Sequence, residues 1–441
     1  MNRLSVVQLC TVLLVLLPAG GAATLNLDVD TAVQLAMENN LELKSERIDL
    51  ETAARVQKST WNEFLPSIDA STSLSRSNER STIGGQDSSP WNLGFAIKAS
   101  LPLSAAKIES IRAVALDYQQ GLVTYEMAKS ELERSVRKAF YSLLVAQESI
   151  RLAEKELATA EERYQQTQAN YESGLVPRLQ VLSTRVSAEN LKPALEEQKV
   201  LYTSSLMDFQ LLLGLDGEDE LTLEGAIVAK AYTFDSEELL ERYLNDRLDI
   251  QSILKQIEIL ENQKQLQKKS SFTPTLSLSA SVQPTLNDPF ASSWVDGDVW
   301  FDNGSMAIAV SVPLDGFIPG SADKLKLAAL DDSIRKARLS LEQTRKQARI
   351  EVESAVLKLD KSLRSIEALE LNVSLAQEAY ELTEKAYQAG TVELLEVRNA
   401  SDDLQKAKLS LLNEKYNYLS GLIDLSYSLN TTLSKLEEQY D

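Results

Sequence analysis

The chain has 441 residues, with 65 acidic against 45 basic side chains and a formal charge of −20. This charge argues against nucleic acid or anionic lipid as a partner. Histidine is absent and Cys10 is the only cysteine, which excludes histidine-based acid–base catalysis, cysteine nucleophiles in a mature chain and the usual zinc sites. We therefore expect no enzyme, no cofactor and no metal site.

Residues 1–23 have the pattern of a cleavable export signal. Arg3 precedes an apolar run from Leu4 to Leu17, and small residues follow up to a cleavage point expected after Ala23. The residues before Cys10 do not form a lipoprotein box, so we expect no acyl anchor. No later apolar run approaches the about 18 residues of a membrane-spanning helix. A mature chain inserted in a membrane would therefore have to form a β-barrel.

The mature chain, 24–441, alternates long helical patterns with two short regions of period two. The helical patterns predict helices over about 30–62, 104–172, 178–214, 236–270, 321–388 and 393–430. The period-two regions predict strands over about 67–77, 91–101, 275–284 and 306–313. Prolines mark the changes of period, with Pro66 and Pro274 where helix becomes strand and Pro102 and Pro313 where strand becomes helix.

The two longest helices carry the same heptad pattern, offset by 216 positions. Apolar and small residues recur in alternating steps of four and three, as in a coiled coil. Identical residues also recur at this offset, in the pairs Tyr164 and Tyr380, Thr167 and Thr383, Tyr171 and Tyr387, and Gly174 and Gly390. Chance rarely reproduces both a heptad and its turn. We interpret the chain as a duplication, with repeat 1 (24–215) and repeat 2 (236–430) joined by a linker (216–235).

The four predicted strands alternate apolar side chains with small or polar ones. A strand of about 9–11 residues suits a transmembrane barrel. The tryptophans fall near these strands or their loops, as an interfacial aromatic belt would place them: Trp61, Trp91, Trp294 and Trp300. Four strands cannot close a barrel, and lipid does not tolerate open sheet edges. Two, three or four copies would therefore share a barrel of about eight, twelve or sixteen strands.

A tight helix reversal follows each long helix, in "YESGLVPRL" and in "YQAGTVELL". We expect Gly174 and Gly390 to adopt φ > 0, where glycine has no steric cost. Arg178 and Arg398 follow these turns and are expected to pair with nearby acids, although exposed ion pairs contribute little.

Taken in order, these stretches resemble the TolC-type outer-membrane efflux proteins. The resemblance covers essentially the whole mature chain, from "TAVQLAMENNLELKSERIDLETA" and "NEFLPSIDAS" through "LNDRLDIQSI" and "FTPTLSLSAS" to "NEKYNYLSGLIDLSYSLN". It implies a mainly α fold with a small β part, in which a homotrimer forms a twelve-stranded β-barrel in outer-membrane lipid and an α-helical barrel tunnel in the periplasm of a diderm bacterium. It also implies a passive exit duct of a tripartite efflux or type I secretion system. A periplasmic adaptor (membrane fusion protein) and an inner-membrane transporter would open its periplasmic tip.

The same resemblance assigns roles to the two reversals, which become the periplasmic tips. Residues at the turns would form the adaptor-binding edges: Gly174, Leu175, Val176, Gly390, Thr391 and Val392. Glu396 would face the pore, Asn399 stands where the family has a second acid, and Gln180 is the first-repeat counterpart of Glu396. The resemblance therefore carries over one acidic ring rather than two. Tyr387 would help to hold the entrance shut by hydrogen bonds, and Tyr171 is its first-repeat equivalent.

Other interpretations remain open at the level of sequence. Glu396 could be a solvated helix carboxylate, and Tyr171 and Tyr387 continue the heptads, so packing is an equally good role for them. The strands could form hairpins of a small soluble sandwich. The chain could also be a periplasmic coiled-coil adaptor or scaffold without its own pore. A carboxylate-based enzyme would need a cleft with paired acids, whereas the acids found here lie on helix surfaces.

Overall fold

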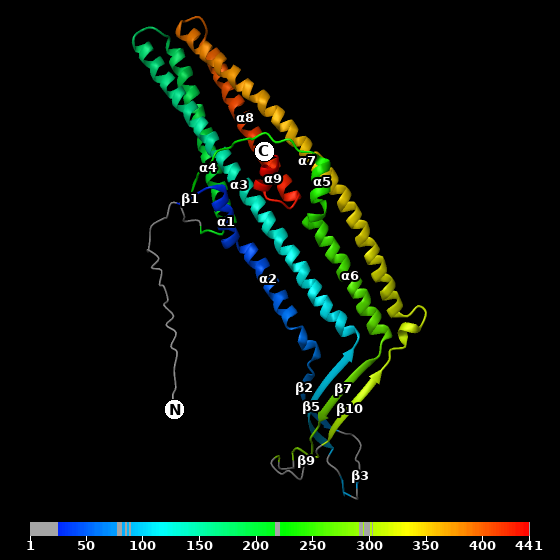
Figure 1. Cartoon of the computed structure of the whole chain (residues 1–441). Coiled ribbons are helices and arrows are strands. Elements are labelled where there is room, and N and C mark those ends of the chain that lie inside the picture. The colour runs from blue at the N-terminus through cyan, green and yellow to red at the C-terminus, as the bar shows by residue number, and fades with distance from the viewer. Residues whose placement is uncertain are drawn as a thin grey trace, which may run out of the picture. The chain divides into compact units, whose positions relative to one another are not determined.

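The computed structural model describes residues 25–76, 82–83, 86–87, 90–216, 221–290, 294, 300–301 and 303–440. The expected export signal and Cys10 lie outside these residues. Within them the fold is mainly helical with a small β part, which confirms the predicted fold class (Figure 1).

The helices follow the sequence pattern with two interruptions. Their bounds are α1 (Val29–Asn39), α2 (Leu41–Lys58), α3 (Ala106–Glu172), α4 (Arg178–Leu213), α5 (Ser236–Tyr243), α6 (Leu248–Phe272), α7 (Ala322–Gln388), α8 (Leu394–Ser428) and α9 (Leu433–Tyr440). Asn40 separates α1 from α2, because its backbone is extended (ψ 130°) and its side-chain amide donates to the carbonyl of Leu212 at 2.9 Å. Arg247 precedes α6 with the same ψ of 130°.

None of the helices among the described residues has an apolar stretch long enough to cross a membrane.

The chain divides into two compact units. We call the first the turn unit, because it contains both helix reversals; its residues come from Met1–Asn40, Leu132–Lys230 and Ser362–Ser420. We call the second the sheet unit, because it contains the long strands; its residues come from Leu41–Glu131, Ala231–Lys361 and Gly421–Asp441. The helices α3, α7 and α8 contribute residues to both units.

The two long helices, α3 and α7, are equal in length, at 67 residues each. Some of the heptad positions predicted from the sequence are buried at the same offset in both helices. Val136 and Val352 are fully buried, and Leu143 and Leu359 are 1% and 2% exposed. A helix of this length spans roughly 100 Å at 1.5 Å per residue.

The turn unit has an apolar core where α3 and α4 pack together. Phe140 and Phe209 are each 1% exposed, and their ring centroids lie 6.3 Å apart. At the margin of this core, β1 (Leu25–Leu27) pairs in parallel with β6 (Leu221–Leu223). The helix α4 ends at Gly214, which adopts φ +71°, and a Cβ atom there would lie 2.4 Å from the carbonyl oxygen of Asn39. Only glycine fits this helix end.

Four long antiparallel strands lie side by side in the sheet unit, in the order β2 (Ser67–Arg76), β5 (Trp91–Ser104), β7 (Thr275–Val282) and β10 (Gly304–Ser311) (Figure 1). The short strands β8 (Thr285–Asn287) and β9 (Trp300–Phe301) extend this sheet, and β3 (Thr82–Ile83) pairs with β4 (Gln86–Asp87). The strand expected to end at residue 101 continues through Pro102, because β5 stays paired with β7 as far as Ser104.

The strand register places the apolar residues of all four strands on one face. Ile97 lies opposite Ala70 on one side and Val282 on the other, and Leu278 lies opposite Ile308. Much of this face is exposed, with Met306 90% and Ile308 76% exposed. Contiguous apolar surface of this kind normally marks a membrane or protein contact.

Candidate functional site

The first helix reversal joins α3 to α4 through Gly174, which adopts φ +76°. Its amide donates to the carbonyl of Tyr171 at 2.9 Å, and the amide of Leu175 donates to the carbonyl of Asn170 at 2.8 Å. These two bonds form a Schellman motif, which satisfies carbonyls that the helix end would otherwise leave unpaired. Pro177 then precedes α4 with an extended backbone.

The second reversal repeats this geometry 216 residues later, between α7 and α8. Gly390 adopts φ +74°, its amide donates to the carbonyl of Tyr387 at 2.8 Å, and the amide of Thr391 donates to the carbonyl of Ala386 at 2.9 Å. Apart from its chain neighbours, no described residue has an atom within 4 Å of a Cβ built on either glycine. The backbone angle alone therefore selects glycine at these two positions.

A side-chain hydrogen bond connects the two reversals. The amide nitrogen Nε2 of Gln180, in the first turn of α4, donates to the hydroxyl of Tyr387 at 2.9 Å. Both side chains are half-buried. Tyr171 occupies the equivalent position in the first repeat but is 40% exposed, and no described side chain bonds to its hydroxyl. The two equivalent tyrosines thus differ in their surroundings.

A cavity of about 720 Å³ separates the two reversals within the turn unit. Five of the sequence-predicted residues line it, namely Val176, Gln180, Tyr387, Gly390 and Val392. An ion pair that the sequence did not predict also faces this cavity: Arg163 of α3 contacts Glu384 of α7 at 3.1 Å. Burial raises the pKa of the neighbouring Tyr380 hydroxyl, and Glu384 raises it further.

Glu396 and Asn399 lie in the first two turns of α8, and both side chains are exposed. Neither lines the cavity between the reversals. Within the described residues, no hydrogen bond joins either of them to Gln180 or Tyr387. The structure therefore brings Gln180 and Tyr387 together but does not bring Glu396 to them.

Arg178 and Arg398 are both exposed, and neither lies within ion-pair distance of a carboxylate in the described part of the chain. Arg398 lines a smaller polar cavity of about 160 Å³ with Glu156 and Asp402. Burial raises the pKa of Glu156, the negative charge of Asp402 raises it further, and the positive charge of Arg398 opposes both. The charge of Arg398 therefore acts on Glu156 without a direct ion pair.

Comparisons with known proteins agree with this architecture. The sequence model of the outer membrane efflux protein family matches residues 32–215 and 239–431. The toluene efflux pump outer membrane protein TtgC of Pseudomonas putida is 23% identical over 415 residues, which cover 90% of this chain and 81% of that protein. The outer membrane protein TolC of Escherichia coli is 24% identical over 424 residues, with the same two coverages of 90% and 81%.

Solved structures show the same fold. The CmeC outer membrane channel of Campylobacter jejuni superposes with a TM-score of 0.76 at 18% identity, and the match covers 93% of this chain and 89% of that one. The VceC outer membrane protein of Vibrio cholerae gives a TM-score of 0.70 at 17% identity, with coverages of 92% and 96%.

The fold, the paired reversals and the apolar sheet face define an outer-membrane efflux channel, and the chain belongs to the outer membrane efflux protein family. This confirms the resemblance seen in the sequence. The protein is a passive exit duct in the outer membrane of a Gram-negative bacterium, and it extends into the periplasm. The family is a class of channels, not a class of enzymes.

Proposed function

We propose that three copies of this chain assemble into one duct, in which their strands share a barrel and their helices share a tunnel. The observation that carries this proposal is the open sheet. Within the described residues, β2 and β10 are edge strands, and the apolar face of the sheet is exposed. Each unpaired backbone group in lipid costs several kcal/mol, so further copies have to pair with these edges. Three copies give about twelve strands, a size that leaves a lumen.

The duplication supports this assembly, because it would turn three chains into six similar units around one axis. We propose repeat 1 (24–215), the linker (216–235) and repeat 2 (236–430) as its divisions. The two segments matched by the family model, 32–215 and 239–431, support these bounds. Each repeat supplies two of the four long strands and one reversal.

The reversals would be the docking edges for a periplasmic adaptor, which in turn would connect the duct to an inner-membrane transporter. Apolar side chains are exposed at both reversals: Leu175 is 74% exposed, Leu179 is 76% exposed, and Leu395, the second-repeat counterpart of Leu179, is 58% exposed. Exposed apolar side chains grouped in this way mark a contact surface. The adaptor edges would be Gly174, Leu175, Val176, Gly390, Thr391 and Val392.

The hydrogen bond between Gln180 and Tyr387 would hold the entrance closed, and docking would shift the equilibrium toward an open form. Glu396 would supply the one acidic ring at the constriction, because Asn399 and Gln180 are neutral. The partners would supply the energy, since the sequence has no glycine-rich nucleotide loop. We infer no catalytic role and no cofactor for the chain.

Fractionation of cells tests the assembly. The proposal predicts an outer-membrane protein that runs on a gel as an oligomer with the mass of three chains and collapses to a monomer on heating. A soluble monomer in the periplasm would contradict it and would favour an adaptor or scaffold. Against that alternative, a coiled-coil scaffold has no need of four strands with an exposed apolar face.

Cross-linking to the adaptor tests the docking edges. The only cysteine lies in the expected export signal, so a single introduced cysteine reports its own position. Leu175→Cys is expected to cross-link to the adaptor. Val200→Cys on α4, which is similarly exposed at 67%, serves as the control. Equal cross-linking at both positions would contradict docking at the reversals.

A further inference from the structure

A second cavity of about 720 Å³ lies between α3 and α8 in the turn unit and shares no residue with the cavity between the reversals. Its walls contain apolar side chains, with Leu144 and Leu152 from α3 and Leu411 from α8, beside polar and charged ones. The segment after β6 closes one side, where a Cβ on Gly225 would lie 3.2 Å from Cδ1 of Leu144. The volume falls within the range of about 300–1,000 Å³ that small-molecule pockets occupy.

Four cationic side chains face this cavity, although the chain as a whole carries a charge of −20. Two of them have a carboxylate partner: Arg151 pairs with Glu148 at 2.5 Å, and Lys415 pairs with Glu370 at 2.8 Å. The other two, Lys155 of α3 and Lys408 of α8, have no carboxylate within ion-pair distance among the described residues.

The first repeat shows which carboxylate partners the equivalent lysine has. Lys192 is the counterpart of Lys408 at the offset of 216, and it contacts both Glu161 and Glu189 at 3.3 Å. The second-repeat counterparts of these two acids are Gln377 and Gln405. The second repeat therefore has the same lysine but a neutral amide at the position of each acid.

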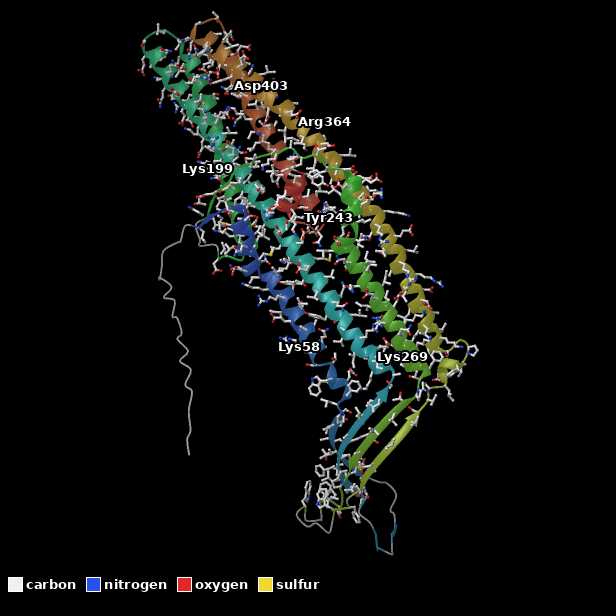
Figure 2. All side chains as sticks on the ribbon, viewed as in Figure 1. Lys58, Lys199, Tyr243, Lys269, Arg364 and Asp403 are labelled. Carbon is white, nitrogen blue, oxygen red and sulfur yellow. The ribbon has the colours of Figure 1, made fainter. Side chains whose placement is uncertain are left out.

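A neighbouring lysine has a carboxylate partner in both repeats, so the difference between the repeats is local. Lys199, labelled on α4 in Figure 2, contacts Glu154 at 2.9 Å. Its second-repeat counterpart is Lys415, which contacts Glu370, and Glu370 is itself the counterpart of Glu154. The lysine–glutamate pair of Lys199 thus occurs in both repeats. The pairs that Lys192 makes occur only in the first repeat.

The pKa values of the two equivalent lysines, Lys192 and Lys408, are shifted in opposite directions. The hydrogen bonds that Lys192 donates to Glu189 and Glu161 raise the pKa of its ammonium group. Burial lowers the pKa of Lys408, and the positive charges of Lys155 and Arg151 lower it further. A group of like charges beside an apolar wall is unfavourable unless an anion joins it.

We propose that this cavity binds an amphiphilic anion, whose carboxylate or phosphate head group lies between Lys408 and Lys155 and whose hydrocarbon chain lies along the leucine walls. The head group would give Lys408 a negative partner, as Glu161 and Glu189 do for Lys192. Ammonium-to-anion hydrogen bonds are among the stronger polar contacts in proteins. Burial of the hydrocarbon chain against the leucine walls adds to the affinity, because it removes apolar surface from water.

Equilibrium dialysis of the full-length oligomer in nanodiscs of neutral lipid tests this proposal. The probes are dodecyl phosphate and dodecanoate, and binding to empty nanodiscs is subtracted. We expect saturable binding of one probe molecule per chain, and the preferred head group identifies phosphate or carboxylate chemistry. Inorganic phosphate lacks the hydrocarbon chain, and dodecyl maltoside lacks the anionic head group. Both are expected to bind much more weakly. Binding of either one as tightly as dodecyl phosphate would overturn the proposal.

Two variants target the head-group contact, and one serves as control. Lys408→Gln removes the charge, and Gln405→Glu restores the acid that the first repeat has at Glu189. Each is expected to weaken dodecyl phosphate binding about tenfold or more, as the loss of a charged hydrogen bond would. Lys406→Gln makes the same change of charge on an exposed residue of α8 that does not line the cavity, and it is expected to leave binding unchanged. Equal affinities for wild type, Lys408→Gln and Gln405→Glu would overturn the proposal.

Discussion

The side-chain amide of Gln180 donates a hydrogen bond of 2.9 Å to the hydroxyl of Tyr387. This bond joins α4 of the first repeat to α7 of the second, beside the two helix reversals. The repeats are otherwise matched here, because Tyr171 and Tyr387 contribute the same backbone carbonyl to the same turn motif. The hydroxyls differ: that of Tyr387 has a partner on the other repeat, whereas no described side chain bonds to that of Tyr171.

Tyr387→Phe removes this bond and little else, because the ring stays in place. A neutral hydrogen bond contributes about 1 kcal/mol. The equilibrium constant between the closed and the open state should therefore shift about fivefold toward the open state in each copy. We expect a higher open probability in planar bilayers. Tyr171→Phe is the matched control and is expected to behave as wild type; equal effects of the two changes would remove the gating role of Tyr387.

Glu396→Gln tests the acidic ring. If three copies of Glu396 line the constriction, their removal should lower the preference for cations over anions by about two- to tenfold, as expected for charges in a narrow, partly desolvated pore. Reversal potentials in a salt gradient measure this preference. Glu393→Gln changes an exposed acid three residues earlier and should have a smaller effect. An unchanged reversal potential in Glu396→Gln would show that this carboxylate is only solvated.

Gly174→Ala tests the turn geometry. The space around Gly174 is open, so the cost comes only from φ +76°, at about 1–2 kcal/mol for a residue with a Cβ. Hydrogen exchange should show faster opening of the last turn of α3. Gly121→Ala is the control, because Gly121 lies inside α3 and its Cβ would make an ordinary 3.6 Å contact with Leu50. That change should stabilise the helix by up to about 1 kcal/mol. Equal exchange in Gly174→Ala and wild type would contradict the strained turn.

The pH dependence of stability should differ in sign at two carboxylates of α3. Burial, and then Asp402, raise the pKa of Glu156 above its ordinary value of 4.5. The folded state therefore binds the proton more tightly, and Glu156 lowers stability as the pH rises through the folded-state pKa. Thermal unfolding should show Glu156→Gln more stable than wild type at neutral pH, with the difference vanishing on acidification below pH 4.5.

Glu148 provides the opposite case. Its hydrogen bonds with Arg151 lower its pKa below 4.5, so its contribution to stability is present at neutral pH and is lost as the pH falls through the folded-state pKa. Glu148→Gln should therefore be less stable than wild type at neutral pH and equal to it in acid. If the stability differences of Glu148→Gln and Glu156→Gln from wild type changed with pH in the same direction, the opposite pKa shifts of the two carboxylates would be contradicted.

Much of the fold could be predicted because the sequence signals are long and local. The heptads predict helices over 104–172 and 321–388, and the structure has them at Ala106–Glu172 and Ala322–Gln388. The breaks at Asn40 and Arg247 could not be predicted, since helical patterns continue through both. Long-range contacts stabilise them: Asn40 bonds to Leu212, and the buried Arg247 contacts Glu351 at 3.0 Å.

The candidate site was predictable only in part, for a related reason. A positive φ at the two reversals follows from glycine in a tight turn. The Gln180–Tyr387 bond joins residues 207 positions apart, not 216, so comparison of equivalent positions in the two repeats does not reveal it. The residues of the Arg163–Glu384 pair lie 221 positions apart, so the same comparison does not predict this pair either.

Single-channel recording in planar bilayers tests the central claim, that this chain forms an exit duct. The purified oligomer is reconstituted without adaptor or transporter, and current is recorded at both voltage polarities. We predict discrete conductance steps that are small in wild type and become larger or more frequent in Tyr387→Phe. A correctly assembled oligomer that conducts no ions, in wild type and in Tyr387→Phe alike, would contradict the claim.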